Sequence, residues 1–307
     1  MSHHLASTTA AASSSPSRRP SLTSFPSPLH RPSALFQQTN FVATRTERKP
    51  APSVAAAAAS PVSPLHRLEE MSDHEAIPER LAVVTGGNRG IGIEVCRQLA
   101  LQGVTVILTA RDEERGKAAL SGKAAHLVES VIIQTYDEAV KCLNTNYYGL
   151  KWATEALLPL LKKSTSGARI INTSSLRSEL QRMPNEKLRE SLRDADSWDE
   201  ARIEAMLSEF LEDMKNGRLE AAGWPMMLPA YSMSKMVVNL YTRILARRHP
   251  EMRINCVHPG FVKTEINWNT GVLPPEEGAR GAVMLALAPG DGPTGCYFDQ
   301  TKMGEAW

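Results

Sequence analysis

Short apolar runs alternate with segments of helical periodicity along most of this chain. Residues 81–85 and 104–110 are rich in β-branched side chains and lack regular polar alternation, which is typical of parallel strands buried on both faces. Between these runs, apolar residues recur every three or four positions, and Gly103 follows where a helix would end. The pattern predicts a right-handed strand–helix–strand unit.

The same alternation continues towards the C-terminus. Residues 136–161 have the periodicity of one long amphipathic helix. Further strands and helices are predicted, in chain order, at 168–175, 230–248, 253–260, 276–288 and 295–299. Strands that alternate with helices indicate an open α/β sheet with ligand sites at the carboxyl ends of its strands.

The N-terminal region has a different composition. Residues 1–68 consist mainly of Ser, Ala, Pro and Thr, with seven Lys or Arg and a single acid, Glu47. Such a segment buries too little apolar surface to offset its ordering entropy, so residues 1–70 are predicted to be a disordered tail and folding to begin near residue 75. Its basic, acid-poor character is typical of transit peptides, which favours a plastid; alternatively, it is an upstream extension, Met71 is the start, and the protein is cytoplasmic.

The overall composition excludes several classes of function. With 307 residues and 42% hydrophobic content the chain can bury a sizeable core, and its formal net charge of +2 creates no field that would recruit nucleic acid or membrane. No apolar run approaches the roughly 18 residues that span a bilayer. The four cysteines are widely spaced, which indicates neither a disulfide framework nor a metal site.

A glycine-rich turn, TGGNRGIG at residues 85–92, joins the first predicted strand to the first helix. Gly86 permits a tight turn, Gly90 lets the backbone approach a pyrophosphate, and Gly92 lets the helix pack closely on the sheet. The turn therefore predicts a nucleotide site, with a purely structural turn as the alternative. Arg89 in the turn and Arg111 after the second strand favour a 2′-phosphate, hence NADP(H); two solvated arginines are the alternative.

Tyr231 and Lys235 begin a predicted helix, and their spacing places phenol and ammonium on one face. The ammonium would lower the pKa of the phenol, which makes Tyr231 a candidate proton donor. Tyr147 and Lys151 have the same spacing but no accompanying serines. The pair Ser174–Ser175 lies at a strand end, where a hydroxyl can bind a substrate carbonyl or simply cap a turn.

Five motifs occur in a particular order: TGxxxGIG, NTNYYG, the serine pair, YxxxK and PGxVxT. In this order they resemble the short-chain dehydrogenase/reductase family, and most of all its plant carbonyl-reductase-like branch, which includes neomenthol dehydrogenase and salutaridine reductase. The resemblance runs from about residue 79 to the C-terminus. It implies a Rossmann-type doubly wound parallel sheet and hydride transfer between NADP(H) and a small-molecule ketone, aldehyde or alcohol.

The resemblance also implies roles for individual residues. Tyr231 would donate the proton, Ser175 orient the carbonyl, Lys235 lower the pKa of Tyr231 and hold the ribose, and Asn146 anchor a proton-relay water. The implied cofactor-binding residues are Gly86, Asn88, Arg89, Gly90, Ile91, Gly92, Arg111, Lys235, Pro259, Gly260, Val262 and Thr264.

An insertion separates Ser175 from Tyr231. The residues Ser197 to Glu200 read as a capping box, and the helix that follows should place Phe210, Leu211 and Met214 on one side. The resembling branch carries an insertion where other family members pair helices to form oligomers, so we expect a monomer.

Between residues 112 and 135 the domain is incomplete. The family pattern has two further strands and a helix there, roughly 60 residues at about 30 per strand–helix–strand unit. Because the strand order 3-2-1-4-5-6-7 places strand 4 between strands 1 and 5, its loss would leave two bare edges or pair strands 1 and 5 directly. Direct pairing would shift the part of the domain that carries Ser175 and Tyr231 by about 5 Å relative to the glycine-rich turn. A displacement of about 1 Å can already lower the rate about a hundredfold. The run 131–133 could act as a substitute strand, although a loop or helix entry fits it better.

Two functions remain open on these grounds. The surviving residues favour an NADPH-dependent carbonyl reductase acting on a terpenoid, alkaloid or aldehyde substrate. The missing segment favours a catalytically silent, truncated isoform that binds cofactor weakly or serves as an interaction module.

Overall fold

The computed structural model describes residues 41–46, 80–110, 135–165 and 167–304. All of these residues belong to one compact unit, Ala34–Trp307. Among them, no helix has the length and apolar character that crossing a membrane requires. Within these ranges there is also no group of three or more His, Cys, Asp or Glu side chains placed to hold a metal ion.

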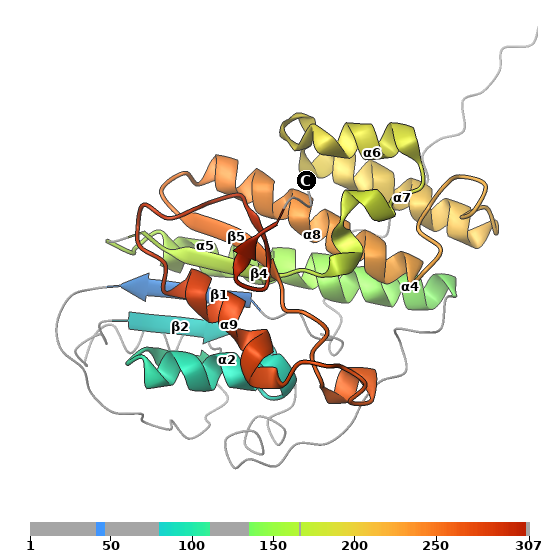
Figure 1. Ribbon diagram of the computed structural model, residues 1–307. Helices are drawn as coiled ribbons and strands as arrows, with labels where there is room; N and C mark the ends of the chain where they lie inside the picture. Colours follow the sequence, from blue (N-terminus) through green and yellow to red (C-terminus); the bar gives the residue numbers. More distant parts are fainter. Residues whose placement is uncertain (1–40, 47–79, 111–134, 166, 305–307) are drawn as a thin grey trace, which may run out of the picture. The chain divides into compact units, whose positions relative to one another are not determined.

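The described residues contain a seven-stranded sheet with the order β3-β2-β1-β4-β5-β6-β7. Figure 1 labels its strands β2, β1, β4 and β5. The predicted α/β fold is confirmed, because β2 pairs in parallel with β3, and β4, β5 and β6 pair in parallel in turn. Only β7 at the edge and β1 in the middle run antiparallel to their neighbours. The strands span β2 Arg80–Val84, β3 Thr105–Leu108, β4 Arg169–Thr173, β5 Arg253–His258, β6 Tyr297–Asp299 and β7 Lys302–Met303.

Strand β1, Phe41–Thr46, comes from the N-terminal region in which the sequence predicts no strand. It lies between β2 and β4, antiparallel to both, with Ala43 opposite Val83 on one side and Ile170 on the other. The expectation of bare edges or direct β2–β4 pairing is therefore wrong, as is the expectation of disorder for these six residues. Val42, Thr44 and Thr46 place a β-branched residue at every second position, and such a segment pairs where two strand edges offer backbone partners on both sides. The run 131–133 lies outside the described residues.

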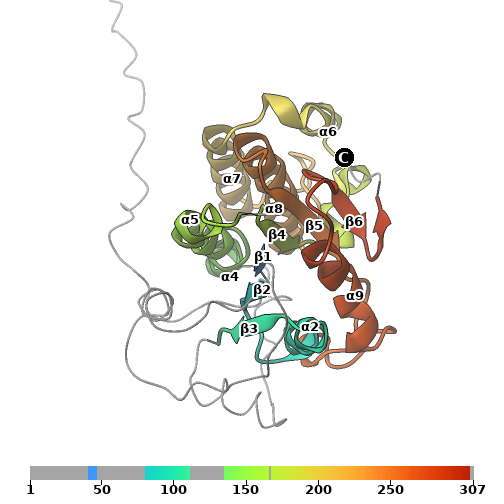
Figure 2. The same cartoon turned by 90° about the vertical axis from the view of Figure 1, so that its left-hand side faces the viewer.

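Helices cover the two faces of the sheet, as the end-on view in Figure 2 shows. On one face lie α2 (Gly90–Leu101) and α9 (Pro275–Ala286), and on the other lie α4 (Tyr136–Leu143), α5 (Gly149–Leu161) and α8 (Pro229–Arg248). Adjacent residues of β4 point to opposite faces, as strand geometry requires: Ile170 is buried in the core beside α8 and Ile171 in the core beside α9. This arrangement explains why the predicted strands lack polar alternation.

The expected single helix over residues 136–161 is interrupted. Residues Asn144–Tyr148 form a π-helical segment, η1, between α4 and α5. A π segment inserts one extra residue per turn and thereby changes the direction in which the following side chains point. The hydrophobic period continues through it, so the sequence pattern alone predicts an unbroken helix.

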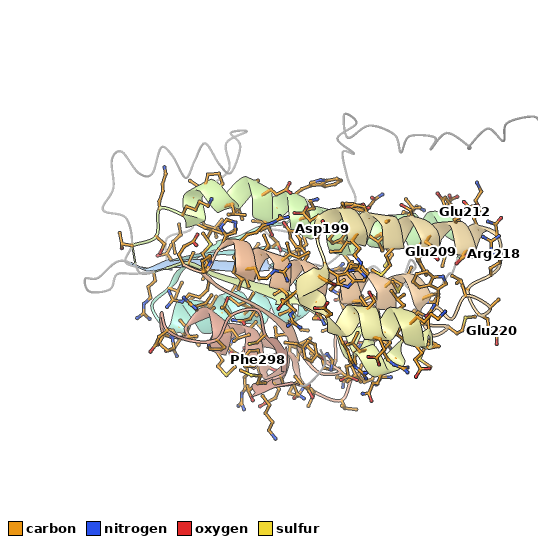
Figure 3. The ribbon with its side chains drawn as sticks, turned by 90° about the horizontal axis from the view of Figure 1, so that it is seen from above. Asp199, Glu209, Glu212, Arg218, Glu220 and Phe298 are labelled. Carbon is orange, nitrogen blue, oxygen red and sulfur yellow. The ribbon has the colours of Figure 1, made fainter. Side chains whose placement is uncertain are left out.

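The insertion forms α6 (Glu186–Arg193) and α7 (Glu200–Lys215), joined by 3-10 turns. The N-cap of α7 is Asp199, whose carboxylate accepts from the Arg202 backbone N–H at 2.8 Å, so the predicted cap at Ser197 is wrong. Phe210 is fully buried, and Leu211 and Met214 pack against the same core, as predicted. Figure 3 shows α7 extending from Asp199 past Glu209 and Glu212.

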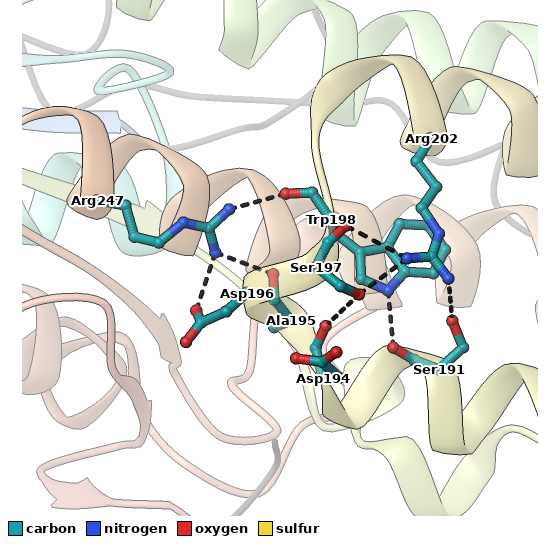
Figure 4. A network of polar contacts seen from close by, with 8 residues as sticks. All are labelled: Ser191, Asp194, Ala195, Asp196, Ser197, Trp198, Arg202 and Arg247. Atoms are coloured by element: carbon teal, nitrogen blue, oxygen red, sulfur yellow. Dashed lines mark hydrogen bonds and ion pairs between the residues drawn. The ribbon is translucent and has the colours of Figure 1, made fainter.

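Arg247 of α8 fastens the connection between α6 and α7 to the sheet domain (Figure 4). Its guanidinium donates to the carbonyl oxygens of Ala195 at 2.9 Å and Trp198 at 2.8 Å, and pairs with the Asp196 carboxylate at 2.9 Å. The Trp198 indole in turn donates to the Ser191 carbonyl at 2.7 Å. The insertion is thus tied by directional hydrogen bonds to the helix that also carries Tyr231.

Candidate active site

The carboxyl ends of the parallel strands bring the predicted site residues to one edge of the sheet. Strand β2 ends at Val84 and leads into the glycine-rich turn, while β4 ends at Thr173 and leads into Ser174 and Ser175. Helix α8 begins at Pro229 and starts alongside β4, because Lys235 reaches the end of that strand. The structure therefore brings together the serine pair and the Tyr231–Lys235 motif.

Tyr231 lies beside Ser175. Burial raises the pKa of the Tyr231 phenol, and a hydrogen bond with the Ser175 side chain acts in the opposite direction. The predicted lowering of this pKa is wrong for this structure, since burial is the dominant influence on it and the Lys235 ammonium lies 5.7 Å from the ring centroid. Tyr231 thus lies next to a hydroxyl that can also bind a carbonyl oxygen.

Lys235 is almost completely buried, with 3% of its surface exposed. Its ammonium donates a hydrogen bond to the Thr173 backbone carbonyl at 2.9 Å, at the point where β4 ends. Burial lowers the pKa of Lys235 to about 8, because the charged form loses its hydration. The second YxxxK match differs: Lys151 pairs with Glu200, and the Tyr147 hydroxyl is buried without a hydrogen-bond partner.

Asn146 lies in the π-helical segment and is 7% exposed. Its side-chain amide donates to the Ser234 hydroxyl at 3.0 Å, and Ser234 donates to the Tyr231 carbonyl at 2.7 Å. The same amide lies 3.6 Å from the Cys142 sulfur. Asn146 is thus linked through Ser234 to the first turn of α8, a contact that a π segment makes possible by redirecting the side chain.

A buried polar network supports the serine pair. The Ser174 hydroxyl donates to the Asn239 side-chain oxygen at 2.5 Å and lies 3.0 Å from the Ser178 hydroxyl. Asn239 also donates to Ser178 at 2.9 Å, which closes the network. Asn239 and Ser178 are functional-site residues that the motifs do not reveal, although a polar residue eight positions after Tyr231 on a buried helix was the available signal.

The glycine-rich turn has the backbone conformation predicted for it. Gly86 and Gly90 have positive φ angles of 62° and 52°, which disfavour any side chain. Gly87, which the sequence analysis passed over, has no room for a side chain: a Cβ there would lie 2.9 Å from the Cys96 sulfur and 2.9 Å from Leu108. Gly92, two positions after the first residue of α2, is buried.

The loop after β5 folds against this turn. A Cβ on Gly90 would lie 3.3 Å from the Thr264 methyl group, so the two loops predicted to hold the cofactor are in contact. Gly260 has a φ of 87°, and a Cβ there would lie 2.4 Å from Leu273. Val262 is buried and bridges to Leu273, which holds the loop in place.

The other residues predicted to bind the cofactor lie at the following places in the structure. Arg89 is the N-cap of α2, and the side chains of Asn88, Arg89 and Ile91 are each half-buried. Pro259 follows β5 directly. Arg111 lies outside the described residues. His258 ends β5, and burial lowers its pKa.

Known proteins resemble this chain over most of their own length. The family model of the short chain dehydrogenases matches residues 80–139. Short-chain dehydrogenase/reductase 1 of Saponaria officinalis is 39% identical over 289 aligned positions, which cover 73% of this chain and 95% of that protein. (+)-Neomenthol dehydrogenase of Arabidopsis thaliana is 37% identical over 290 aligned positions, which cover 74% of this chain and 98% of that protein. The solved structure of salutaridine reductase from Papaver somniferum superposes with a TM-score of 0.64 at 33% identity, over 71% of this chain and 98% of that one.

The alignment length also measures the internal deletion. Because 73% of 307 residues is about 224, about 65 of the 289 positions aligned with the Saponaria protein have no residue in this chain. This agrees with the roughly 60 residues that two strands and a connecting helix would occupy.

Proposed function

Because the chain belongs to the short-chain dehydrogenase/reductase family of oxidoreductases, we propose that it is an NADP(H)-dependent carbonyl reductase that acts on a ketone or aldehyde. The observation that carries the proposal is the convergence of Tyr231, Ser175, Lys235 and Asn146 at the end of β4. The relatives' names include neomenthol dehydrogenase, salutaridine reductase and carbonyl reductase [NADPH] 3. We therefore propose a terpenoid, alkaloid or related aldehyde as the substrate.

The residues of the turn suit a dinucleotide. Helix α2 begins directly after the glycine-rich turn and without a side-chain cap, so its first backbone N–H groups can bind a phosphate. Gly90, Gly260 and Thr264 would hold the cofactor between the two contacting loops. Arg89 favours the 2′-phosphate of NADP(H) over the free hydroxyl of NAD(H). When bound, the nicotinamide supplies the hydride.

In the reaction, this chain's own residues position the carbonyl and handle the proton. The Ser175 hydroxyl binds the carbonyl oxygen of the substrate, and the Tyr231 hydroxyl donates its proton to that oxygen as hydride reaches the carbon. Lys235 fastens the first turns of α8 to the end of β4, and Asn146 fastens them to the π-helical segment through Ser234.

The position of β1 supports activity despite the deletion. With a strand between β2 and β4, the glycine-rich turn and the catalytic residues are two strand spacings apart, as in the family order, rather than one. This removes the displacement of about 5 Å on which the argument for a silent isoform rested. We therefore favour the reductase over the interaction module.

The test is turnover by the full chain. NADPH oxidation would be followed by nicotinamide absorbance with a panel of cyclic terpenoid ketones, alkaloid ketones and aldehydes. Tyr231→Phe should lower kcat by about 10²-fold or more, because the general acid is lost. Tyr147→Phe is the matched control and should keep full activity, since that hydroxyl has no partner. Turnover that survives Tyr231→Phe would contradict the assignment.

A further inference from the structure

Residues 41–46 occupy an inner position in the sheet, far along the chain from the strands they pair with. Their pairing is continuous on both sides: residues 42–46 lie opposite β2, and residues 41–44 lie opposite β4. Helices from both faces, α5 and α9, also contact this strand. Figures 1 and 2 both place β1 between β2 and β4.

The strands on either side need such a partner. At most 1% of the surface of Ile170 and Ile171 in β4 is exposed, and Ala82 and Val84 of β2 are completely buried. Each backbone N–H or C=O left unpaired in such surroundings costs about 1–3 kcal/mol. A sheet open between β2 and β4 would also expose two parallel-strand edges, which favour aggregation.

The direction of β1 follows from its place in the sequence. Thr46 lies opposite Arg80, so the 33 residues 47–79 connect two ends that meet at the same edge of the sheet. An antiparallel neighbour needs no crossover to the other end of the sheet, and the entropic cost of a longer loop rises by only about 0.6 kcal/mol per doubling. An antiparallel strand can therefore fill the gap from the N-terminal side without a crossover connection.

We propose that residues 41–46 are an integral strand of the reductase domain, which replaces the lost inner strand within the same chain, and that NADP(H) binding requires it. The second half of this statement rests on the proposed function; the first half does not. Cleavage of a leader between residues 46 and 80, or translation from Met71, would remove the strand and open the sheet between the turn and the catalytic residues. A leader compatible with activity must end before Phe41.

The strand assignment is tested by cross-linking in the full chain. Ala43 and Val83 are cross-strand partners, so Ala43→Cys with Val83→Cys should form a disulfide, because paired Cα atoms lie about 4.5–5.5 Å apart. Thr46→Cys with Val83→Cys is the matched control: an offset of three residues separates these positions by about 10 Å along the strand. Peptide mapping distinguishes this link from those of the four native cysteines.

A 43–83 link within one chain, without a 46–83 link, is the expected result. Equal links in both variants, or none, would overturn the assignment. A link that joins two chains would overturn the intramolecular form, because the strand would then come from a second copy.

The requirement for cofactor is tested by NADPH titration, followed by nicotinamide fluorescence. Ala43→Pro removes a backbone donor from an inner strand, where every N–H faces one of two neighbours, and should weaken binding at least tenfold. Ala57→Pro is the control in the same N-terminal region and should bind like the unsubstituted chain. Equal binding by all three would overturn the requirement. If the unsubstituted chain does not bind NADPH while the 43–83 link forms, the proposed function fails and the strand assignment stands.

Discussion

The Ser174 hydroxyl donates a 2.5 Å hydrogen bond to the side-chain oxygen of Asn239 on α8. Its neighbour Ser175 instead contacts the phenol of Tyr231. The two adjacent serines at the end of β4 thus have different contacts: one fastens the strand end to the helix, and the other lies beside Tyr231, the proposed proton donor.

Substitution of each serine should separate stability from activity. Ser174→Ala leaves Asn239 without its donor in a buried network and should lower the free energy of unfolding by about 1–3 kcal/mol. Ser175→Ala should lower kcat by about 10²-fold with little change in stability, because it removes a group that binds the carbonyl oxygen. Urea unfolding and NADPH oxidation measure the two effects. If Ser174→Ala kept full stability and lost turnover, the division of tasks would be wrong.

The buried Lys235 should make stability depend on pH. Its pKa is about 8 in the folded protein against 10.5 in the ordinary range, so the unfolded chain binds more protons between these values. The difference corresponds to about 3 kcal/mol of destabilisation below pH 8, which disappears as the pH rises towards 10.5.

Lys235→Met removes this penalty together with one hydrogen bond worth about 1 kcal/mol. The variant should therefore be more stable than the unsubstituted chain at pH 7 by about 2 kcal/mol and lose that advantage by pH 10.5, while its turnover falls. Parallel urea titrations at several pH values give the comparison. A constant difference across this range would show that Lys235 is not the group responsible.

The turn at the end of β2 should tolerate no side chain at Gly87. Gly87→Ala places a methyl group 2.9 Å from the Cys96 sulfur and from Leu108, and should cost about 1–3 kcal/mol of stability through overpacking. In a Cys96→Ala background the cost should fall by at least about 0.5 kcal/mol, because one of the two clashes is relieved. Thermal unfolding of the four proteins completes this cycle, and strict additivity would contradict the packing argument.

The insertion should keep the protein monomeric. Helix α7 contacts α4 and α8, and it buries Leu207 and Phe210 against them, so this part of the helical layer is already covered within the chain. Sedimentation of the full chain at micromolar concentration should show one species with the mass of a single chain. A dimer or tetramer under these conditions would be inconsistent with this role of the insertion.

Much of the fold could be predicted from local patterns. The β-branched runs predicted β2, β3, β4 and β5 to within one or two residues, because strands buried on both faces must be apolar throughout. The positive φ angles of Gly86 and Gly90 follow from the turn motif. The predictions at α7 and across residues 136–161 were less accurate, since caps and π segments depend on single backbone hydrogen bonds that periodicity does not encode.

The sequence by itself determined the alternating strands and helices, the glycine-rich turn, and the spacing of Tyr231 and Lys235, because these depend on neighbours within a few residues. Only the tertiary structure decided that Phe41–Thr46 fills the gap between β2 and β4, since strand pairing is non-local and any extended segment of suitable length can compete for an open edge. It also decided the direction of the Tyr231 pKa shift, because burial by elements distant in the sequence raises it, whatever the spacing to Lys235 suggests.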